Sequence, residues 1–85
     1  MRIETESFFD RDYARLPQRI QERAEKQLAL LLSNPQHPSL HLKKMEGWGD
    51  IWEGRVTRGY RFTFTQEGDT YSLRRIGTHD ILKRP

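Results

Sequence analysis

The feature that most constrains the fold is a strict alternation of apolar and polar residues over positions 60–65. Successive side chains of a β-strand point to opposite faces, so Tyr60, Phe62 and Phe64 would share one face. Arg61 and the two threonines of the segment would share the other. The segment therefore predicts a strand with one face in the core and one open face.

A turn before this strand sets its first neighbour. We expect residues 57–59 to form a three-residue hairpin loop, with Gly59 in the left-handed conformation that such a loop needs. A two-residue loop at 58–59 would split the apolar face, which argues against it. The three-residue loop pairs Val56 with Tyr60, Gly54 with Phe62, Trp52 with Phe64 and Arg55 with Arg61.

A second turn sets the neighbour on the other side. Glu67 and Gly68 are typical of a two-residue turn. This turn would place Phe64 opposite Tyr71, Phe62 opposite Leu73 and Arg61 opposite Arg74.

Together, the two registers predict that Arg55, Arg61 and Arg74 form a row across three strands on the open face. Like charges that face each other destabilise a sheet. We therefore interpret the row as a site for an anion, and arginine forks match phosphate oxygens well. The alternative is a solvated strand face on which each arginine leans toward a nearby carboxylate.

Elsewhere the pattern predicts two helices and further strands. A strand is expected at 2–6, and a short helix at 8–15 with Ser7 as its N-cap. An amphipathic helix is expected at 17–32 and would form a helical hairpin with the first. Its core stripe would be Ile20, Ala24, Leu28, Leu31 and Leu32. Strands at about 40–45, 51–57 and 71–76 would complete the sheet, with a glycine-rich turn at 46–50.

Length and composition limit the possible classes of protein. At 85 residues, the chain predicts a single domain spanning 1–85. It has no cysteine, which excludes disulfides and thiolate chemistry. No segment has the composition of a membrane span or a signal peptide, so we expect a cytoplasmic protein.

The charge is unevenly distributed along the chain. Residues 1–40 contain six basic and six acidic residues, whereas residues 41–85 contain nine basic and six acidic residues. The formal excess of +3 therefore lies in the second half and favours an anionic partner.

Several classes of functional site find no support in the sequence. His37, His41 and His79 lack the spacing of metal ligands, so we expect neither a metal nor another cofactor. A nucleophile elbow, a phosphate-binding glycine loop and the paired motifs of an RNA-recognition module are also missing.

What remains is a basic open face bordered by ionisable side chains, namely Lys43, Lys44, Glu46 and His79. Such a face could cleave RNA without a metal. A base would take the proton of a 2′-hydroxyl, which attacks its own phosphate, and Arg61 would stabilise the charge on the phosphorane. An acid would then protonate the departing 5′-oxygen, a role that suits histidine near neutral pH. The alternative for His79 is a surface residue at the end of the sheet.

In their order along the chain, four short motifs resemble the RelE/ParE superfamily of bacterial toxins. The similarity is greatest to the RelE-like mRNA interferases of the YoeB and YafQ types, and it extends over nearly the whole chain. The motifs are Leu42-Lys43-Lys44-Met45-Glu46-Gly47, Trp52-Glu53-Gly54-Arg55-Val56-Thr57, Tyr60-Arg61-Phe62 and Ile76-Gly77-Thr78-His79-Asp80.

This resemblance implies an α+β fold. An N-terminal strand and a helical hairpin would pack on one face of a mostly antiparallel, twisted sheet of four to five strands. It implies an endoribonuclease that enters the ribosomal A site and cuts mRNA there, and a cognate antitoxin that wraps the domain.

The resemblance also implies roles for particular residues. Arg61 matches the arginine that stabilises the transition state, and His79 matches a histidine that serves acid–base chemistry. Lys43, Lys44 and Glu46 lie where the base is found. Further contacts to RNA phosphates are expected from Arg55, Arg58, Arg74 and Lys83.

The chain departs from the family pattern at two places. Leu82 and Lys83 stand where many members have an aromatic residue that stacks on a base, and a strand histidine of YafQ-like members is replaced around Val56. Two alternative functions stay open. One is a ParE-like toxin that acts on DNA gyrase, and the other is a non-catalytic RNA-binding module.

Overall fold

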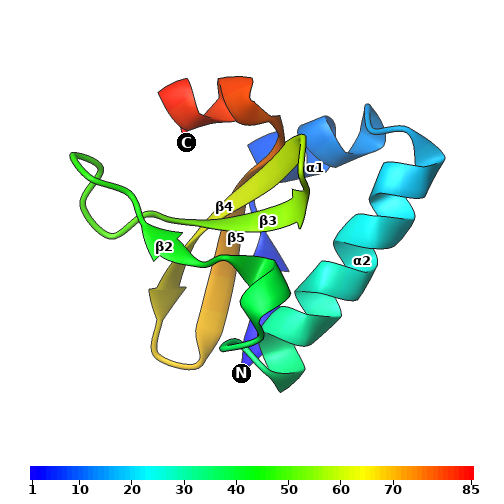
Figure 1. Ribbon diagram of the computed structural model, residues 1–85. Helices are drawn as coiled ribbons and strands as arrows, with labels where there is room; N and C mark the ends of the chain where they lie inside the picture. Colours follow the sequence, from blue (N-terminus) through cyan, green and yellow to red (C-terminus); the bar gives the residue numbers. More distant parts are fainter.

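The computed structural model covers residues 1–85 and contains five strands, two α-helices and two short 3-10 helices (Figure 1). In chain order these are β1 (Arg2–Thr5), α1 (Ser7–Ala14), α2 (Gln18–Ser33), η1 (Pro38–Leu40), β2 (Lys43–Lys44), β3 (Trp52–Thr57), β4 (Tyr60–Glu67), β5 (Thr70–Thr78) and η2 (His79–Lys83). Neither α-helix has the length and apolar character needed to cross a bilayer.

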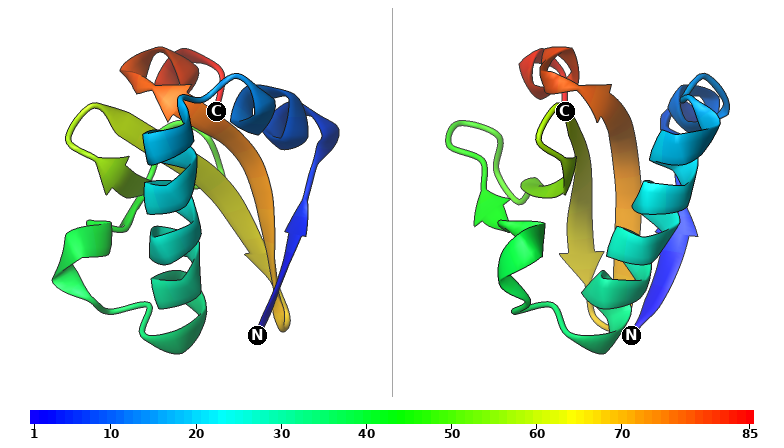
Figure 2. Two further views of the ribbon diagram at one scale, coloured as in Figure 1. Left: turned by 90° about the vertical axis from the view of Figure 1, so that its right-hand side faces the viewer. Right: turned by 45° about the vertical axis from the view of Figure 1, so that its right-hand side comes forward.

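All five strands form one mixed sheet in the order β1-β5-β4-β3-β2. Strand β1 runs parallel to β5, and the other neighbours are antiparallel. Both helices lie on the same side of the sheet, where α1 packs on β5 and α2 packs on β3 (Figures 1 and 2). The predicted α+β fold is therefore confirmed, and the opposite face of the sheet is left open.

The core is built around β4, as the alternation in the sequence predicted. Phe62 and Phe64 are buried, and the Phe64 ring contacts Trp52, Phe62 and Tyr71 with ring centroids 5.5–6.5 Å apart. Helix α2 adds Ile20, Ala24, Leu28 and Leu31 to this core. The prediction for Leu32 is wrong, because its side chain is 42% exposed near the end of the helix.

The hairpin between β3 and β4 corrects the predicted loop but keeps three of the four predicted pairs. Arg55 faces Arg61, Gly54 faces Phe62 and Trp52 faces Phe64, as expected. The predicted pairing of Val56 with Tyr60 is wrong. The turn itself has two residues, since Thr57 pairs with Tyr60, and Gly59 is not among the glycines with a positive φ. A β-bulge between Arg55 and Thr57 absorbs the extra residue, and Val56 stays buried within it. The bulge thus preserves the apolar face that a regular two-residue hairpin would have split.

The hairpin between β4 and β5 differs more from the expectation. Glu67 pairs with Thr70, so the turn is Gly68-Asp69, and a second bulge between Thr63 and Phe64 leaves Arg74 without a partner. In place of the predicted pairs, Phe64 faces Leu73, Phe62 faces Ile76, Gln66 faces Tyr71 and Arg61 faces Gly77. The predicted row of three arginines is therefore wrong in its third member.

Two boundaries also differ from the prediction. Ser7 lies inside α1 and does not cap it; Glu6 precedes the helix and makes no side-chain cap bond. The strand expected at 40–45 is shortened to β2, because His41 adopts a left-handed conformation with φ 44° that ends η1 and breaks the extended chain.

Gly54 lies directly under the ring of Phe62 on the neighbouring strand. A Cβ atom at this position would lie 2.3 Å from the Phe62 ring and 3.0 Å from Leu42. Since Phe62 is completely buried, the ring has no free space into which it could move. Close packing of the aromatic core therefore requires glycine here.

We expect Gly54→Ala to lower the free energy of unfolding by about 1–3 kcal/mol, the usual cost of overpacking a core. The melting temperature would fall by about 4–8 °C for each kcal/mol in a domain of this size. Gly59→Ala is the matched control, because nothing lies within 4 Å of a Cβ there. Equal melting temperatures for the two variants would contradict this account of the core.

Candidate active site

A cavity of about 580 Å³ lies on the open face of the sheet, opposite the helices. Strands β3 and β4, the segment that leads into β2, and η2 all contribute to its walls. The lining residues are His41, Leu42, Lys43, Glu53, Arg55, Arg61, His79 and Leu82. The fold thus brings two arginines, two histidines, a lysine and a glutamate to one hollow.

Arg61 is held in place by the hairpin turn next to it. Its Nη1 atom donates to the backbone carbonyl oxygens of Thr57 at 2.7 Å, Arg58 at 2.9 Å and Tyr60 at 3.0 Å. No other group of the chain bonds its Nε or Nη2 atoms. The tight turn therefore fixes the guanidinium by one edge and leaves the rest of its donors available to a ligand.

Arg55 faces Arg61 across the strand pair and contacts a histidine from another segment. Its Nη1 atom lies 3.2 Å from Nε2 of His41. A guanidinium can only donate hydrogen bonds, so a hydrogen bond here requires the His41 tautomer whose Nε2 atom is unprotonated and accepts. His41 is also the only non-glycine residue with a positive φ. Such backbone strain often accompanies functional sites.

The backbone beneath Arg55 is anchored from the helix side. Gln27 of α2 is buried, and its Nε2 atom donates to the carbonyl oxygens of Arg55 at 3.0 Å and Ser39 at 3.3 Å. The Gln27 amide therefore connects α2 both to the strand that carries Arg55 and to the segment that carries His41. Gln27 was not predicted as a buried residue, and its only signal in the sequence is that it lies between Ala24 and Leu28 of the predicted core stripe.

Several polar atoms in and beside the cavity have no partner. Glu53 approaches Lys43 at 3.6 Å through Oε1, but its Oε2 atom is buried without a hydrogen bond, as are Arg55 Nε and Thr63 Oγ1. Buried polar groups are nearly always bonded, so three such atoms within one region are unusual. They indicate a site whose bonding is incomplete in the free protein.

The electrostatics of Arg61 agree with this picture. Burial lowers the pKa of the Arg61 guanidinium from its ordinary value, the positive charge of Arg55 lowers it further, and Glu53 opposes both effects. The group stays protonated near neutral pH. A lowered pKa nevertheless means that its charge is less stable here than in water, and an anion bound in the cavity would relieve the difference.

His79 reaches the cavity from the last part of the chain. Strand β5 ends at Thr78, whose Oγ1 atom accepts a hydrogen bond from the backbone of Asp80 and so starts η2. The His79 side chain is exposed and makes no hydrogen bond with the chain, so both ring nitrogens are available. It lines the same hollow as Arg61, as the motif had suggested.

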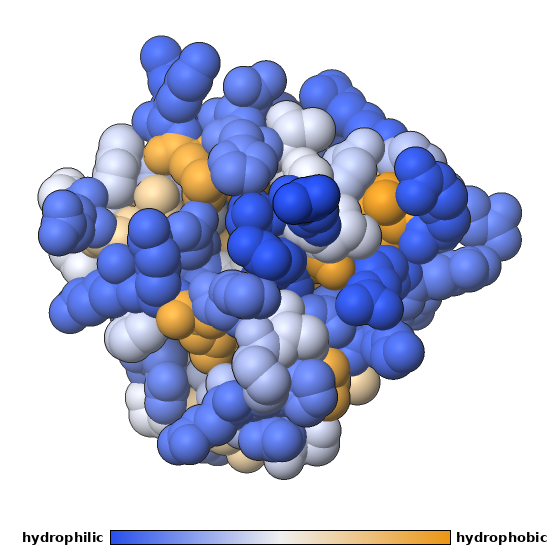
Figure 3. Space-filling model, in the orientation of Figure 1, coloured by the Kyte–Doolittle hydropathy of each residue, from blue (hydrophilic) through white to orange (hydrophobic).

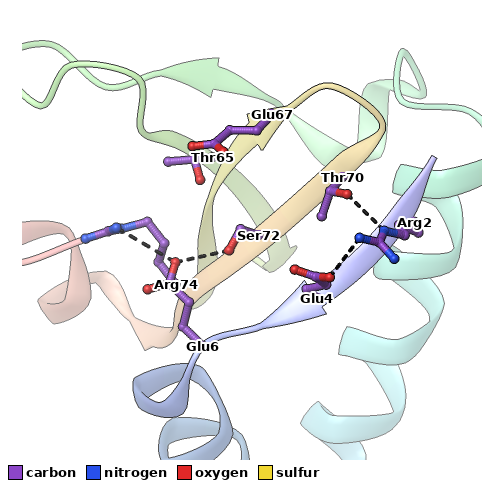
Figure 4. Close-up of a pocket in the computed structure, with 8 residues that line it drawn as sticks. All are labelled: Arg2, Glu4, Glu6, Thr65, Glu67, Thr70, Ser72 and Arg74. Carbon is purple, nitrogen blue, oxygen red and sulfur yellow. Dashed lines mark hydrogen bonds and ion pairs between the residues drawn. The ribbon is translucent and has the colours of Figure 1, made fainter.

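The other predicted site residues lie outside this cavity. Lys44 and Glu46 line an adjoining hollow of about 470 Å³, and Arg58 and Lys83 are exposed on the turn and on η2. Arg74 lies farther along β5, where it forms an ion pair with Glu6 at 3.8 Å and donates to the Pro85 carbonyl oxygen at 3.2 Å. Figure 4 shows the carboxylate of Glu6 joined both to Arg74 and to Ser72 in a separate polar pocket.

His41 was not predicted as a site residue. The alternation over residues 40–43 could have indicated it, because it directs the His41 side chain outward on the same side as Lys43.

No group of three or more histidine or acidic side chains is placed to hold a metal ion. The surface in the orientation of Figure 3 is mostly hydrophilic, with small, separate apolar areas. The arrangement is thus suited to binding an anion and to moving protons next to it.

Solved structures with the same fold are RelE-like toxins. The crystal structure of YafQ from E. coli superimposes with a TM-score of 0.79 at 18% identity, covering 94% of each chain. The YoeB/ParE toxin from Agrobacterium tumefaciens gives 0.78 at 18% identity, over 93% of this chain and 99% of that one. In the RelB–RelE antitoxin–toxin complex from Methanococcus jannaschii, the matching chain gives 0.70 at 22% identity over 93% of each.

The comparisons of sequence, unlike those of structure, find no match. No protein-family model matches the chain, and no curated protein matches it. At this level of identity, the structural similarity establishes the fold alone. The chain therefore has the RelE-like toxin fold.

We expect inorganic phosphate to stabilise the protein through the arginine pair. At ten times its dissociation constant, phosphate would add about 1.4 kcal/mol to the free energy of unfolding, measurable as a rise in melting temperature at constant ionic strength. Arg55→Ala should abolish most of this rise. Arg19→Ala, which removes an exposed arginine of α2 on the other side of the sheet, should retain it. The same rise in all three proteins would show that the effect is a general one of the salt.

Proposed function

We propose that the chain is the toxin of a bacterial type II toxin–antitoxin system and that it cleaves mRNA on the ribosome. The observation that carries this proposal is the single cavity in which two guanidinium groups and two imidazole groups meet. Binding a phosphate needs only the cations. A pair of histidines beside them adds the proton transfers that cleavage requires.

In this proposal, Arg55 and Arg61 bind the scissile phosphate. Their opposed positions on β3 and β4 allow both to reach oxygens of one phosphate, and Arg61 is already oriented by the hairpin carbonyls. Charge grows on these oxygens in the phosphorane transition state, where preorganised donors are most effective. Lys43 adds a further cation at the rim of the cavity.

His41 is the proposed general base. Its contact with Arg55 uses the Nε2 lone pair as the acceptor, and that lone pair is also what a base needs. When a phosphate draws the Arg55 guanidinium away, the same lone pair becomes free to accept the proton of the 2′-hydroxyl. The predicted candidates for this role, Lys43, Lys44 and Glu46, lie at the rim or in the adjoining hollow.

His79 is the proposed general acid. The 2′-oxygen forms a bond to phosphorus, the bond from phosphorus to the 5′-oxygen breaks, and His79 gives that oxygen a proton. The products are a 2′,3′-cyclic phosphate and a 5′-hydroxyl. The reaction needs no water and no redox partner, and the proton gained by His41 balances the one lost by His79.

Two partners belong to the proposal. E. coli YafQ has been crystallised with its antitoxin DinJ, and RelE chains with RelB, which supports an antitoxin that covers this chain. The basic open face would present the cavity to mRNA in the ribosomal A site, within the cytoplasm. A ParE-like action on DNA gyrase uses the same fold, but it gives no role to a histidine pair around an arginine pair.

Primer extension on a defined mRNA in a translation extract tests the function. We expect discrete cuts with the wild-type protein and a loss of about 10²–10³ in rate with Arg61→Ala, the effect of removing one transition-state contact. Arg19→Ala, which removes an exposed arginine of α2 on the other side of the sheet, is the matched control and should cleave normally. Intact mRNA together with trapped gyrase–DNA complexes would favour the gyrase alternative.

A substrate with sulfur in place of the 5′-oxygen tests the two histidine roles. Thiolate leaves without a proton, so this substrate should restore cleavage by His79→Ala but not by His41→Asn, where asparagine suits the left-handed backbone. The measured quantity is the single-turnover rate on ribosomes that carry the modified mRNA. Rescue of the His41 variant alone would reverse the assignment of acid and base.

A further inference from the structure

The glycine-rich turn between β2 and β3 presents a tryptophan that the core does not use. Trp48 is 44% exposed, and it lies between Gly47 and Gly49, both of which have positive φ. It stacks on no other ring, and its indole N–H donates no hydrogen bond within the chain. The other tryptophan, Trp52, is packed against Phe64 in the core.

The turn holds this tryptophan in a defined place. The N–H group of Met45 donates to Ile51 at 2.9 Å, and that of Ile51 donates to the carbonyl oxygen of Trp48 at 3.3 Å. Lys44 and Asp50 approach each other at 3.9 Å across the turn. A large, exposed aromatic side chain on a braced turn is therefore positioned for contact with something outside the chain.

Trp48 also lies where two hollows of the open face meet. The hollow that holds Lys44 and Glu46 shares Lys43, Glu53 and Leu82 with the proposed active-site cavity, and it extends to Trp48. On its other side, Trp48 borders a hollow of about 360 Å³ lined also by Arg74, Arg75, Arg84 and Phe8. The shared residues join the three hollows into one groove that leads away from Arg61.

The charges along this groove suit a polyanion more than an apolar partner. Two lysines (43 and 44) and two glutamates (46 and 53) lie on one side of the indole, and three arginines and one glutamate (Glu6) lie on the other. Five basic side chains against three acidic ones leave the groove with a net positive charge. Arg75 forms an ion pair with Asp12 at 2.6 Å, and Arg74 forms one with Glu6. The Arg84 side chain forms no ion pair. A flat aromatic surface between cations is the arrangement that binds single-stranded nucleic acid, with bases on the ring and phosphates on the charges.

We propose that Trp48 stacks on the base of a nucleotide neighbouring the scissile phosphate. The substrate would then be a single-stranded RNA segment that continues along the groove past the active-site cavity. The inference rests on the proposed nuclease function and adds to it a base-binding position on the β2–β3 turn. Stacking accepts any base, so this position would determine affinity and the placement of the strand and not the identity of the base.

Binding of a short single-stranded RNA that carries a 2′-O-methyl group at every position tests this inference, because such an RNA cannot be cleaved. Fluorescence anisotropy at low salt would give the dissociation constants. We expect Trp48→Ala to weaken binding roughly 5- to 100-fold, the effect of losing one base–aromatic stack, and Trp48→Phe to restore most of it. Leu32→Ala removes an equally exposed apolar side chain on α2 and should bind as the wild type does.

Abasic substitutions identify the stacked base. At one position in the RNA, removal of the base should weaken binding to the wild type but should have no effect on binding to Trp48→Ala. Equal affinities of the wild type and Trp48→Ala, with mRNA still cut by the wild type, would overturn this inference and leave the nuclease function intact. Failure of the wild type both to bind RNA and to cut mRNA would overturn the two together.

Discussion

The opposition of Arg55 and Arg61 across β3 and β4 is the constraint on which the rest of the site depends. Two like charges at directly facing positions destabilise a sheet, and here both are also half-buried. The surrounding structure offsets part of this destabilisation. Backbone carbonyls of the turn accept from Arg61, His41 accepts from Arg55, and Glu53 lies near both. The compensation is incomplete, since Arg55 Nε and Glu53 Oε2 have no partner. An anion that accepts from Arg55 Nε would complete the hydrogen bonding of this arginine.

Two β-bulges shape the cavity around this pair. The bulge at Val56 keeps Arg55 on the open face although the turn is short. The bulge at Arg74 reverses the sides of the residues that follow it, so that Leu73 and Ile76 both enter the core and Gly77 comes to lie beside Arg61. A glycine at that position leaves room above the strand for Ile81 of η2, which lies 3.0 Å from a Cβ built there. Through this close packing, η2 carries His79 to the cavity.

The sequence predicted both helices and the central strand because each depends on a local period in the chain, and the resemblance to the toxin superfamily supplied the fold class. The sequence also predicted the Arg55–Arg61 pair, which follows from keeping the aromatic residues on one face. The position of Arg74 was predicted wrongly, although the sequence carries a sign of the bulge: two arginines separate the apolar residues Leu73 and Ile76, which breaks the alternation. The role of Gln27 was hidden, because its burial depends on the carbonyl groups of Arg55 and Ser39, which are distant in sequence. His41 was missed for a related reason: its left-handed backbone ends the strand that the alternation had extended through it.

The bulge at Val56 absorbs one residue of the hairpin that joins the two arginines. A chain one residue shorter between them would form a regular hairpin with a two-residue turn, in which Arg55 would still face Arg61 and Gly54 would still face Phe62. If the lost residue were Arg58, Val56 would face Tyr60 and remain on the core side of the sheet. A deletion in this exposed turn would therefore remove the bulge and leave both the cavity and the core in register.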